Sequence, residues 1–417
     1  MFEKVVKMLS KYMYGLGAVI IIATGPQDTA MAEPGITKST IRIAGIMDLE
    51  GRSRGLGQGM RDGIRAALKN EKIQGRRIAY STSNDSYTPS KTIAETNKVV
   101  RQNNFLVMGN VGTPTAKVSL PILAKHNVPA VGFFTGAGLL RPGVGDIINY
   151  RASYVQETAA VIDSALRAGI KSSQICAFVQ NDAYGMAGVE GIKRALLSQP
   201  GTKKIVASLN RIIKMKGDNP ARNGTGPVGV YQRNTFASKE GYESLKKWEA
   251  KNGSKCKVVV SVGTYNSIAR FAGYAKYKGE RWVISAVSFT GADNFKNVLK
   301  EFSVNDNIVM TQVVPPLNSK LPIVNDAKKI LGENFGYVTL EGYIVGKMWL
   351  AIMSQIKGDI TREKFINAAK GNKFNLGGVD IDFTDDNQGS DLVLLTYLDD
   401  GEYKIMRNSI WKKMLKI

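Results

Sequence analysis

The chain has 417 residues, 43% of them hydrophobic, with 43 glycines and 13 prolines. This length accommodates two domains of ordinary size, and the composition is that of a globular protein, not of a disordered or fibrous one. The formal net charge is +22, but the basic residues are dispersed in pairs such as Arg76-Arg77 and Lys246-Lys247. Dispersed charge argues against a nucleic-acid surface, which concentrates its cations on one face. Attraction toward an anionic ligand or a membrane surface remains open.

The first 32 residues have the parts of a secretory signal peptide. Lysines precede an uncharged, mostly apolar run at residues 14–24, and Ala30-Met31-Ala32 supplies the small residues that precede a cleavage site. A membrane span needs ~20 apolar residues, so the run is short for an uncleaved anchor, which is the alternative. We therefore predict that residues 1–32 are a cleaved signal peptide and that the mature chain begins at Glu33.

From residue 41 onward, short β-rich runs alternate with amphipathic helical stretches. Strands are predicted at residues 41–46, 77–81, 106–109, 128–134 and 147–152, and helices at residues 58–69, 89–102 and around 116–123. Gly55, Gly57 and Gly59 precede the first helix, but Met60 occupies the third glycine position of a dinucleotide-binding motif. We predict a Gly-rich loop at the rim of a cleft and no nucleotide site.

Two segments with hydroxyl side chains directly follow predicted strands. Residues 109–115 contain Thr113 and Thr115 and open a helix, and residues 133–138 contain Thr135. Ligands of open α/β sheets bind outside the carboxyl ends of the strands. These hydroxyls and the neighbouring backbone N–H groups would suit a carboxylate or another anionic or amide oxygen. Ordinary helix caps are the alternative explanation.

The same rhythm begins again near residue 153, where Ser153 is a candidate cap for a helix over residues 155–167. The remaining predicted elements are strands at residues 175–179, 205–208, 258–262, 282–287, 308–314, 379–383 and 392–397, a long helix at residues 338–356, an inserted surface loop at residues 217–229 and a basic tail at residues 409–417. Strands separated by helices imply parallel sheets, and there are too many strands for one sheet of ordinary size. The sequence predicts an α/β fold with two doubly wound lobes.

Few residues suit metal or catalytic chemistry. Cys176 and Cys256 are the only cysteines, and an oxidising compartment would permit a disulfide between them. Both lie in strand-like runs, however, which favours two buried free thiols. His126 is the only histidine, so a His/Cys metal site is excluded and a Ser-His-Asp triad would depend on a residue late in a predicted helix. We predict no metal, no cofactor and no enzymatic activity.

Eight short segments together carry a resemblance to a known family. They are GQGMRDG (57–63), NDSYTP (84–89), GNVGTPT (109–115), FTGAGLLR (134–141), YRASY (150–154), QNDAYG (180–185), TQVVP (311–315) and LEGY (340–343). The chain resembles the periplasmic leucine/isoleucine/valine-binding proteins of ABC transporters, which have the type I solute-binding fold. The similarity extends over residues 41–403.

The resemblance implies two lobes joined by three crossover strands, with the ligand held between the lobes. Lobe 1 would comprise residues 40–152 plus 313–375, and lobe 2 residues 153–312 plus 376–408. The resemblance places these candidate ligand-binding residues: Gly112, Thr113, Thr115, Thr135, Gly136 and Ala137 in lobe 1, Ser153 at the junction, and Tyr184, Tyr265, Ser288 and Phe289 in lobe 2. It also implies a periplasmic, monomeric component of an ABC importer that presents a small molecule to an inner-membrane permease. A receptor domain that feeds a signalling partner is the alternative.

One departure from the family pattern bears on the ligand. Members that take α-amino acids place an acidic side chain on the turn after the strand at residues 282–287, where it meets the ammonium group. This chain has Ser288-Phe289-Thr290 at that turn. An amino acid would therefore require Asp182 or Glu157 as a substitute, and a carboxylate, amide or aromatic ligand is equally consistent with the sequence.

Overall fold

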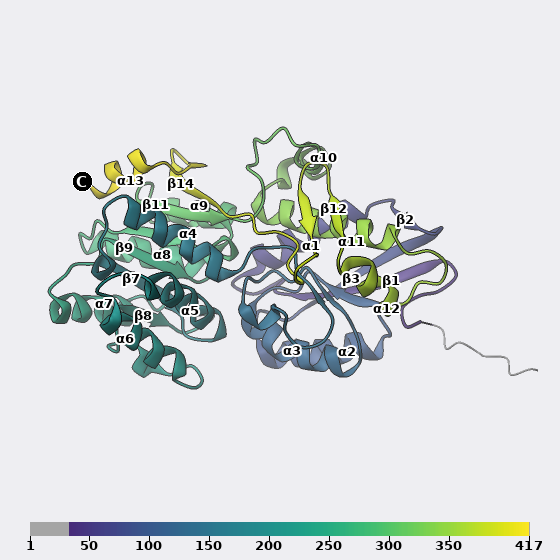
Figure 1. Cartoon of the computed structure of the whole chain (residues 1–417), viewed down its shortest axis with the longest axis horizontal. Helices are drawn as coiled ribbons and strands as arrows, with labels where there is room; N and C mark the ends of the chain where they lie inside the picture. Colours follow the sequence, from purple (N-terminus) through teal and green to yellow (C-terminus); the bar gives the residue numbers. More distant parts are fainter. Residues whose placement is uncertain (1–32, 417) are drawn as a thin grey trace, which may run out of the picture. The chain divides into compact units, whose positions relative to one another are not determined.

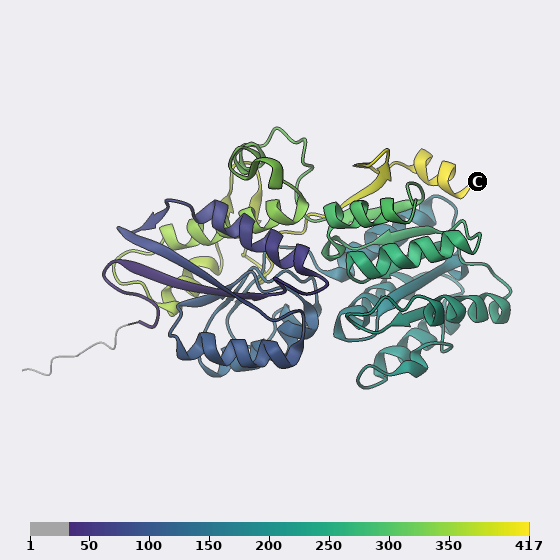
Figure 2. The same cartoon turned by 180° about the vertical axis from the view of Figure 1, so that it is seen from behind.

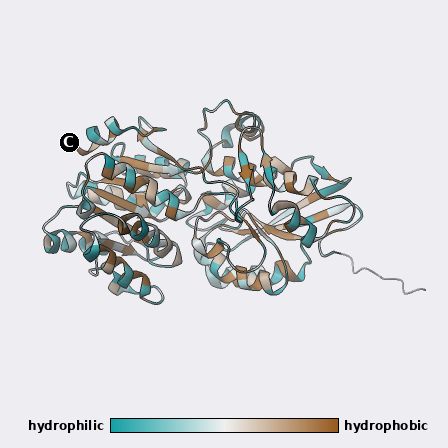
Figure 3. Cartoon of the chain, viewed as in Figure 1, coloured by the Kyte–Doolittle hydropathy of each residue, from teal (hydrophilic) through white to brown (hydrophobic). Residues whose placement is uncertain are grey.

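The computed structural model describes residues 33–416, so the predicted signal peptide at residues 1–32 lies outside the described residues. Residues 33–416 form two α/β lobes, each with a sheet that has helices on both faces (Figures 1 and 2). Apolar residues concentrate on the strands of both lobes, and hydrophilic residues on the outer sides of the helices (Figure 3). Among the helices of this part of the chain, none has the length and apolar character needed to span a bilayer. The predicted two-lobed α/β fold is confirmed.

Lobe 1 contains a sheet with the strand order β2-β3-β1-β4-β5-β6, parallel except for the β2–β3 pair. Its strands are β1 (Thr40–Met47), β2 (Lys72–Ile73), β3 (Arg76–Asn84), β4 (Leu106–Met108), β5 (Ala130–Val131) and β6 (Ile147–Ile148). Its helices are α1 (Arg54–Leu68), α2 (Pro89–Arg101), α3 (Thr113–Lys125), η1 (Gly138–Leu140), α10 (Pro322–Leu331), η5 (Gly332–Asn334), α11 (Tyr337–Ser354) and α12 (Arg362–Ala369). Helices α1 and α11 cover one face of the sheet, and α2 and α3 cover the other (Figure 1).

Lobe 2 contains a sheet with the strand order β15-β14-β11-β10-β9-β7-β8, in which β14 and β15 run antiparallel to their neighbours. Its strands are β7 (Ile175–Gln180), β8 (Val228–Tyr231), β9 (Val258–Val262), β10 (Val283–Ala286), β11 (Ile308–Gln312), β14 (Leu394–Asp399) and β15 (Glu402–Ile405). Its helices are α4 (Tyr154–Arg167), η2 (Ser172–Gln174), α5 (Ala183–Leu197), α6 (Lys203–Lys214), η3 (Pro220–Arg222), α7 (Lys239–Asn252), α8 (Tyr265–Tyr277), η4 (Ser288–Thr290), α9 (Ala292–Glu301) and α13 (Asn408–Leu415).

Within residues 33–416 the chain passes between the two sheets three times, after β6, after β11 and before β14. This agrees with the three crossovers that the resemblance implied. A separate hairpin pairs β12 (Lys373–Asn375) with β13 (Asp380–Asp382). The predicted lobe boundary between residues 375 and 376 falls inside this hairpin, and Asn149 beside β6 donates its backbone N–H to Asn387, just past the hairpin. The exact limits of the lobes otherwise remain a prediction.

Residues 205–208 are part of helix α6 and not a strand, so that prediction was wrong. Ile205, Leu209 and Ile212 are buried on one side of α6, and their spacing is that of a helix. A short apolar run fits a strand or a helix, and here Leu209 and Ile212 continue the run at helical spacing.

The segment at residues 217–229 is more than the surface loop that was predicted. It contains η3 and the start of β8. The buried Arg222 donates to the carbonyl oxygens of Ile212, Gly217 and Met215. Because this guanidinium satisfies several backbone acceptors at once, it fixes the segment against α6.

The glycines at positions 55, 57 and 59 lie inside α1 and not in a loop, which corrects a second prediction. They permit close packing: a Cβ atom on Gly57 would lie 2.0 Å from the carbonyl oxygen of Asp48. Along the same helix, a Cβ atom on Gly63 would lie 2.1 Å from the carbonyl oxygen of Thr339 in α11. The glycine pattern therefore reflects the approach of backbones at the α1–α11 crossing.

Cys176 and Cys256 form a disulfide with a Cα–Cα distance of 5.8 Å, so the prediction of free thiols was wrong. Cys176 lies in β7, and Cys256 lies two residues before β9, which pairs with β7. Neighbouring strands bring the two side chains together, so a strand-like setting does not argue against pairing. The bond closes a loop with a sequence separation of 80 in lobe 2.

The basic C-terminal segment forms α13 and is docked on lobe 2. The Trp411 side chain is buried, and its indole Nε1 donates to Ser164 Oγ of α4 at 2.8 Å. A buried indole with its N–H satisfied anchors the helix despite the neighbouring lysines.

Candidate functional site

The residues predicted from the sequence to bind a ligand follow the carboxyl ends of strands in both lobes. Thr113 follows β4 and Thr135 follows β5, whereas Tyr184 follows β7, Tyr265 follows β9 and Phe289 follows β10. Parallel strands of one sheet end at the same edge, and the edges of the two sheets meet at the boundary between the lobes. Contacts between the lobes at these positions define the candidate site.

Lobe 1 contributes a set of hydroxyls that are already hydrogen-bonded to one another or to the backbone. Thr113 Oγ1 and Thr135 Oγ1 are 2.6 Å apart, and Thr135 Oγ1 also accepts from the backbone N–H of Ala137 at 3.3 Å. Thr115 Oγ1 donates toward the carbonyl oxygens of Val111 and Gly112 at 2.7 and 2.9 Å. Thr115 therefore uses its hydroxyl on the backbone of its own helix, and no side chain caps the start of α3.

Five aromatic side chains from the two lobes form a cluster at the boundary, here called the interlobe aromatic cluster: Tyr87, Phe134, Tyr154, Tyr184 and Phe289. Phe289 is at its centre and is fully buried. Its ring centroid lies 4.6 Å from that of Tyr184, 5.2 Å from Phe134 and 6.3 Å from Tyr87. Tyr154 extends the cluster, with its ring 5.2 Å from Tyr184. Both lobes therefore share one apolar contact surface.

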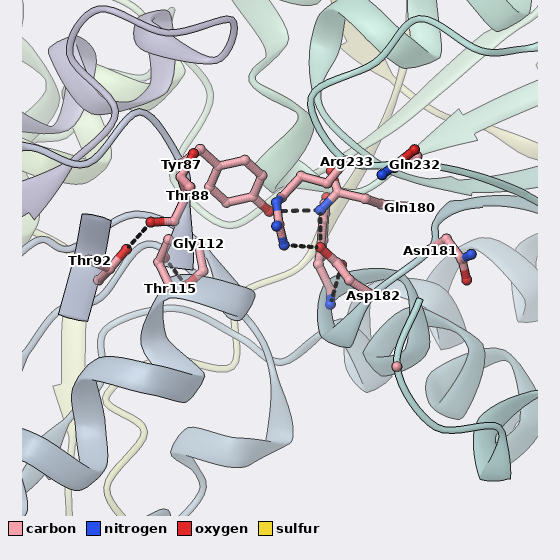
Figure 4. Close-up of polar contacts among 12 residues, drawn as sticks. Tyr87, Thr88, Thr92, Gly112, Thr115, Gln180, Asn181, Asp182, Gln232 and Arg233 are labelled. Atoms are coloured by element: carbon pink, nitrogen blue, oxygen red, sulfur yellow. Dashed lines mark hydrogen bonds and ion pairs between the residues drawn. The ribbon is translucent and has the colours of Figure 1, made fainter. Parts of the chain in front are cut away.

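Tyr87 also makes a polar contact across the boundary (Figure 4). Its hydroxyl oxygen accepts from Gln180 Nε2 at 3.1 Å, and the same nitrogen donates to Asp182 Oδ2 at 2.8 Å. Arg233 pairs with that Asp182 oxygen at 3.0 Å. This chain of contacts from lobe 1 to lobe 2 fixes the Tyr87 ring against Phe289.

The loop that carries Tyr87 has an unusual backbone. Ser86 and Tyr87 have positive φ angles of 50° and 54°, which L-residues adopt only under local constraint. Asp85 provides that constraint, because its carboxylate accepts from the Tyr87 backbone N–H at 2.9 Å and from the Thr92 hydroxyl at 2.8 Å. Burial raises the pKa of Asp85 to about 6.

Tyr265 lies at the edge of the boundary and not in its centre. Its hydroxyl oxygen accepts from the backbone N–H of Gly55 at 3.4 Å, a long contact between the lobes. The next residue, Asn266, donates from Nδ2 to the carbonyl oxygen of Arg52 at 2.7 Å. These contacts place the start of α1 at the rim, where the sequence had placed its glycines.

A group of buried charges lies at the first crossover between the lobes. Arg151 is 1% exposed; its Nε is 3.2 Å from Glu341 Oε1, and its guanidinium lies 4.4 Å from the Phe134 ring centroid. Arg151 also donates to Ser288 Oγ of lobe 2. Burial alone lowers the pKa of Arg151, but the carboxylates of Glu341 and Glu157 outweigh it and raise that pKa above its ordinary value. The guanidinium therefore stays charged.

The two glutamates differ in their surroundings. Glu157 Oε2 accepts from the backbone N–H of Ser288 at 2.7 Å and from the Thr311 hydroxyl at 2.5 Å. Within the described part of the chain Glu341 has Arg151 as its only such partner, and burial raises its pKa to about 7. A carboxyl group with this pKa exchanges its proton near neutral pH.

Besides Arg151 Nε, which is ion-paired with Glu341, three polar atoms of this segment are buried without a hydrogen-bond partner among the described residues: Arg151 Nη1, Tyr154 Oη and Glu157 Oε1. Buried polar groups are normally paired, and an unpaired one costs free energy. The three atoms belong to one short segment that begins at the crossover and enters α4. This segment is therefore the part of the boundary with unused hydrogen-bonding capacity.

The structure brings most of the predicted residues together at the lobe boundary, but Ser153 caps helix α4. Ser153 Oγ accepts from the backbone N–H of Gln156 at 3.3 Å, and the Gln156 side chain accepts in return from Ser153 N at 2.7 Å, which is a capping box for α4. Gly112 and Gly136 make room for rings, since a Cβ atom on them would lie 2.3 Å from Tyr87 and 2.8 Å from Tyr154.

Sequence reasoning missed several residues of the boundary. These are Tyr87, Phe134, Arg151, Tyr154 and Gln180, which the structure places beside the predicted ones. All of them lie inside the segments that carry the family resemblance, whereas Glu157 was named from the sequence as a possible substitute acid. That co-location was the available signal, whereas the residue types alone suggest core packing.

Comparison with known proteins gives a consistent result. A family model described as periplasmic binding protein matches residues 40–209. A solved structure, a possible leucine/isoleucine/valine-binding protein from Rhodopirellula baltica SH 1, is 30% identical, with a TM-score of 0.78, covering 90% of this chain and 98% of that one. No curated protein matches the sequence.

Two further solved structures share the fold at lower identity. A branched-chain amino acid ABC transporter protein from Thermus thermophilus with bound valine has a TM-score of 0.70 and 16% identity, covering 91% of this chain and 99% of that one. A solute-binding protein of an ABC transporter from R. palustris in complex with 4-hydroxybenzoate has a TM-score of 0.70 and 15% identity, covering 88% and 96%. At these identities the likeness concerns the fold alone.

Proposed function

The chain belongs to the type I periplasmic binding protein family, and from this premise we propose that it is the substrate-binding component of an ABC importer. It binds a small amino-acid-like, amide or carboxylate ligand between its two lobes. It acts as a monomer in the periplasm, after removal of residues 1–32, and passes the ligand to an inner-membrane permease. It carries out no reaction on the ligand.

One observation carries this proposal: the buried Phe289 ring of lobe 2 lies against Phe134 and Tyr87 of lobe 1. A ring with this many contacts across a boundary is exposed when the lobes move apart. The open form therefore exposes the interlobe aromatic cluster, and the closed form buries it. A ligand that touches both lobes favours the closed form by its differential affinity for the two states.

The three chain crossings provide the hinge. Residues that connect β6 to α4, β11 to α10 and β13 to β14 are the covalent links between the sheets in the described chain. Rotation about a few backbone bonds in such links separates the lobes without disturbing either core. The hydroxyls of Thr113 and Thr135 and nearby backbone N–H groups then meet the polar end of the ligand, and the rings meet its apolar part.

The test is a thermal-shift screen of amino acids, amides and aromatic acids on the wild-type protein and on a Phe289→Ala variant. A ligand of the folded form raises the melting temperature, by a stabilisation of about 2.7 kcal/mol at about 100 times its Kd. The variant should lose most of that shift, because the ring that touches both lobes is gone. Tyr184→Ala is a second test; each of these substitutions removes a fully buried ring and costs about 3–5 kcal/mol by itself, so the ligand-induced shift is measured from each variant's own unliganded melting temperature.

Phe302→Ala is the matched control. Phe302 packs beside Gly273 within lobe 2, away from lobe 1, so this variant should keep the ligand-induced shift. A screen in which no compound stabilises the wild-type protein would count against the receptor function. So would a Phe289→Ala variant that responds to the ligand as fully as the wild type.

A further inference from the structure

We propose, on the basis of the function proposed above, that the ligand of this site is a small aromatic carboxylate and that Arg151 and Tyr154 hold its carboxylate group. Both residues come from the segment that links the first lobe crossing to α4. Neither was among the ligand-binding residues expected from the sequence.

The first support is the unused donors of these two side chains. Arg151 is 1% exposed and Tyr154 is also buried, yet Arg151 Nη1 and Tyr154 Oη have no acceptor within residues 33–416. A charged donor in this state is the most costly kind of unpaired group. A carboxylate has two oxygens that accept strong, charge-assisted hydrogen bonds from such donors.

The second support is that both side chains pack at the interlobe aromatic cluster. The Arg151 guanidinium lies 4.4 Å from the Phe134 ring centroid, and the Tyr154 ring packs against Tyr184 and the backbone at Gly136. Phe134 and Tyr184 in turn both contact Phe289, at 5.2 and 4.6 Å. The donors therefore adjoin the interlobe aromatic cluster, whose rings can stack on a planar ligand body.

The third support is the balance of charge. Arg151 and Arg141 lie beside Glu157 and Glu341, and Arg141 donates to the carbonyl oxygen of Arg151 at 2.6 Å. Burial raises the pKa of Glu341 to about 7, so near neutral pH part of the protein carries Glu341 in its neutral form. The four side chains together then have an excess positive charge, which an anionic ligand compensates.

An α-amino acid fits the same groups less well, because the unpaired carboxylate oxygen that could meet its ammonium, Glu157 Oε1, belongs to a group that already neutralises Arg151. Asp182 is engaged by Arg233, Gln180 Nε2 and the Tyr184 backbone N–H. Glu157 Oε2 is engaged by Ser288 and Thr311, and the remaining oxygen belongs to a carboxylate that already balances Arg151. An ammonium group there would compete with the guanidinium for the same negative charge.

The test is calorimetric titration of the full mature protein with benzoate, 4-hydroxybenzoate, benzamide, phenylalanine and leucine. Benzoate and 4-hydroxybenzoate should bind at least about tenfold more tightly than benzamide, which has the same shape without the charge. They should also bind more tightly than either amino acid. This comparison uses the wild-type protein alone and so does not depend on a variant that folds.

A Tyr154→Phe variant then tests the residue assignment. Removal of one hydroxyl should weaken benzoate binding about five- to tenfold and leave benzamide binding nearly unchanged. Tyr242→Phe is the matched control, because the Tyr242 hydroxyl donates to Glu280 inside lobe 2, at 2.8 Å, and should have no part in binding. Unliganded melting temperatures of both variants establish that they are folded.

The outcomes separate the two proposals. If leucine, phenylalanine or benzamide binds as tightly as benzoate, the ligand class is wrong and the receptor function stands. If Tyr154→Phe binds benzoate as tightly as the wild type, the assignment of Tyr154 is wrong. If a wider screen of amino acids, amides and acids also finds no ligand, the receptor function itself fails.

Discussion

The two sides of the lobe boundary are built differently. On the lobe 1 side, Thr113, Thr115 and Thr135 use their hydroxyls within lobe 1, and glycines at positions 112 and 136 allow rings to approach. On the lobe 2 side, aromatic rings dominate, and Tyr154 and Glu157 keep polar atoms without a partner among the described residues. The three threonines of lobe 1 are therefore already positioned, and the unused capacity lies in lobe 2 and the adjoining crossover, with Asn110 Nδ2 as the exception on the lobe 1 side.

This difference indicates how specificity is divided. A surface with satisfied hydrogen bonds changes little when a ligand arrives, because its geometry is fixed by its own contacts. A surface with unpaired buried donors gains most from a ligand that supplies the matching acceptors. Substitutions on the lobe 1 side should consequently act through shape and stability, and those on the lobe 2 side through ligand choice.

The largest expected effect distinguishes the cores of the two lobes. Replacing both Cys176 and Cys256 by Ala opens the only disulfide of residues 33–416, which lies in lobe 2 and closes a loop with a sequence separation of 80. The loss should be about 4 kcal/mol, because the unfolded chain gains the freedom that the bond removes. Hydrogen exchange should then show lower protection in β7 and β9 and unchanged protection in β1 and β4. Equal loss in both lobes would show that the lobes unfold as one unit.

The next effect concerns Glu341 of lobe 1, whose carboxyl group pairs with Arg151 at the first crossover. Burial raises the pKa of Glu341 to about 7, so the folded protein binds a proton that the unfolded chain releases near its ordinary value. The stabilisation from this group is present at low pH and is lost as the pH rises through about 7. Between about pH 5 and about pH 8 the free energy of unfolding of the wild type should fall by at most about 3 kcal/mol more than that of a Glu341→Gln variant.

Urea unfolding of both proteins across this pH range measures that difference. Asp85, whose pKa burial also raises to about 6, is present in both proteins and cancels in the comparison. Parallel pH profiles for the wild type and the variant would contradict the assignment of a protonated Glu341 to the junction.

The smallest effect addresses the shape of the lobe 1 surface. Gly112 has a φ of 110°, and a Cβ atom there would lie 2.3 Å from the Tyr87 ring. Gly112→Ala should cost about 2 kcal/mol in unfolding free energy and displace Tyr87 from Phe289, which weakens ligand binding. Gly138→Ala is the control, since a Cβ atom on Gly138 meets nothing within 4 Å. Similar stability and affinity in the two variants would show that Tyr87 is not held by this contact.

The sequence predicted the framework well because apolar periodicity and strand spacing are local. The strand at residues 258–262 was predicted with the bounds that β9 has, and the helix after Ser153 begins one residue earlier than predicted. The mistaken strand at residues 205–208 shows the limit of this method, because its few apolar residues fit either element. The disulfide was missed since the pairing of β7 with β9 is a long-range feature.

The candidate site could be predicted only in part. Thr113 and Thr135 follow strand ends and carry hydroxyls, so their position in the sequence is informative. Phe134 and Arg151 look like core or hinge residues until the fold shows that they meet Phe289 and Ser288 of the other lobe. Contacts between lobes depend on how the chain crosses three times, which no local pattern contains.

The most direct test of the central claim is a distance between spin labels on the two lobes, with and without ligand. Cysteines introduced at the exposed positions Ala94 in α2 and Lys239 in α7 carry the labels, since the native cysteines are paired in a disulfide. We expect a broad distance distribution without ligand and one shorter, narrow distance at saturating benzoate or whichever acid the titration selects. A distribution that stays unchanged while the ligand binds would show that the lobes do not close on it.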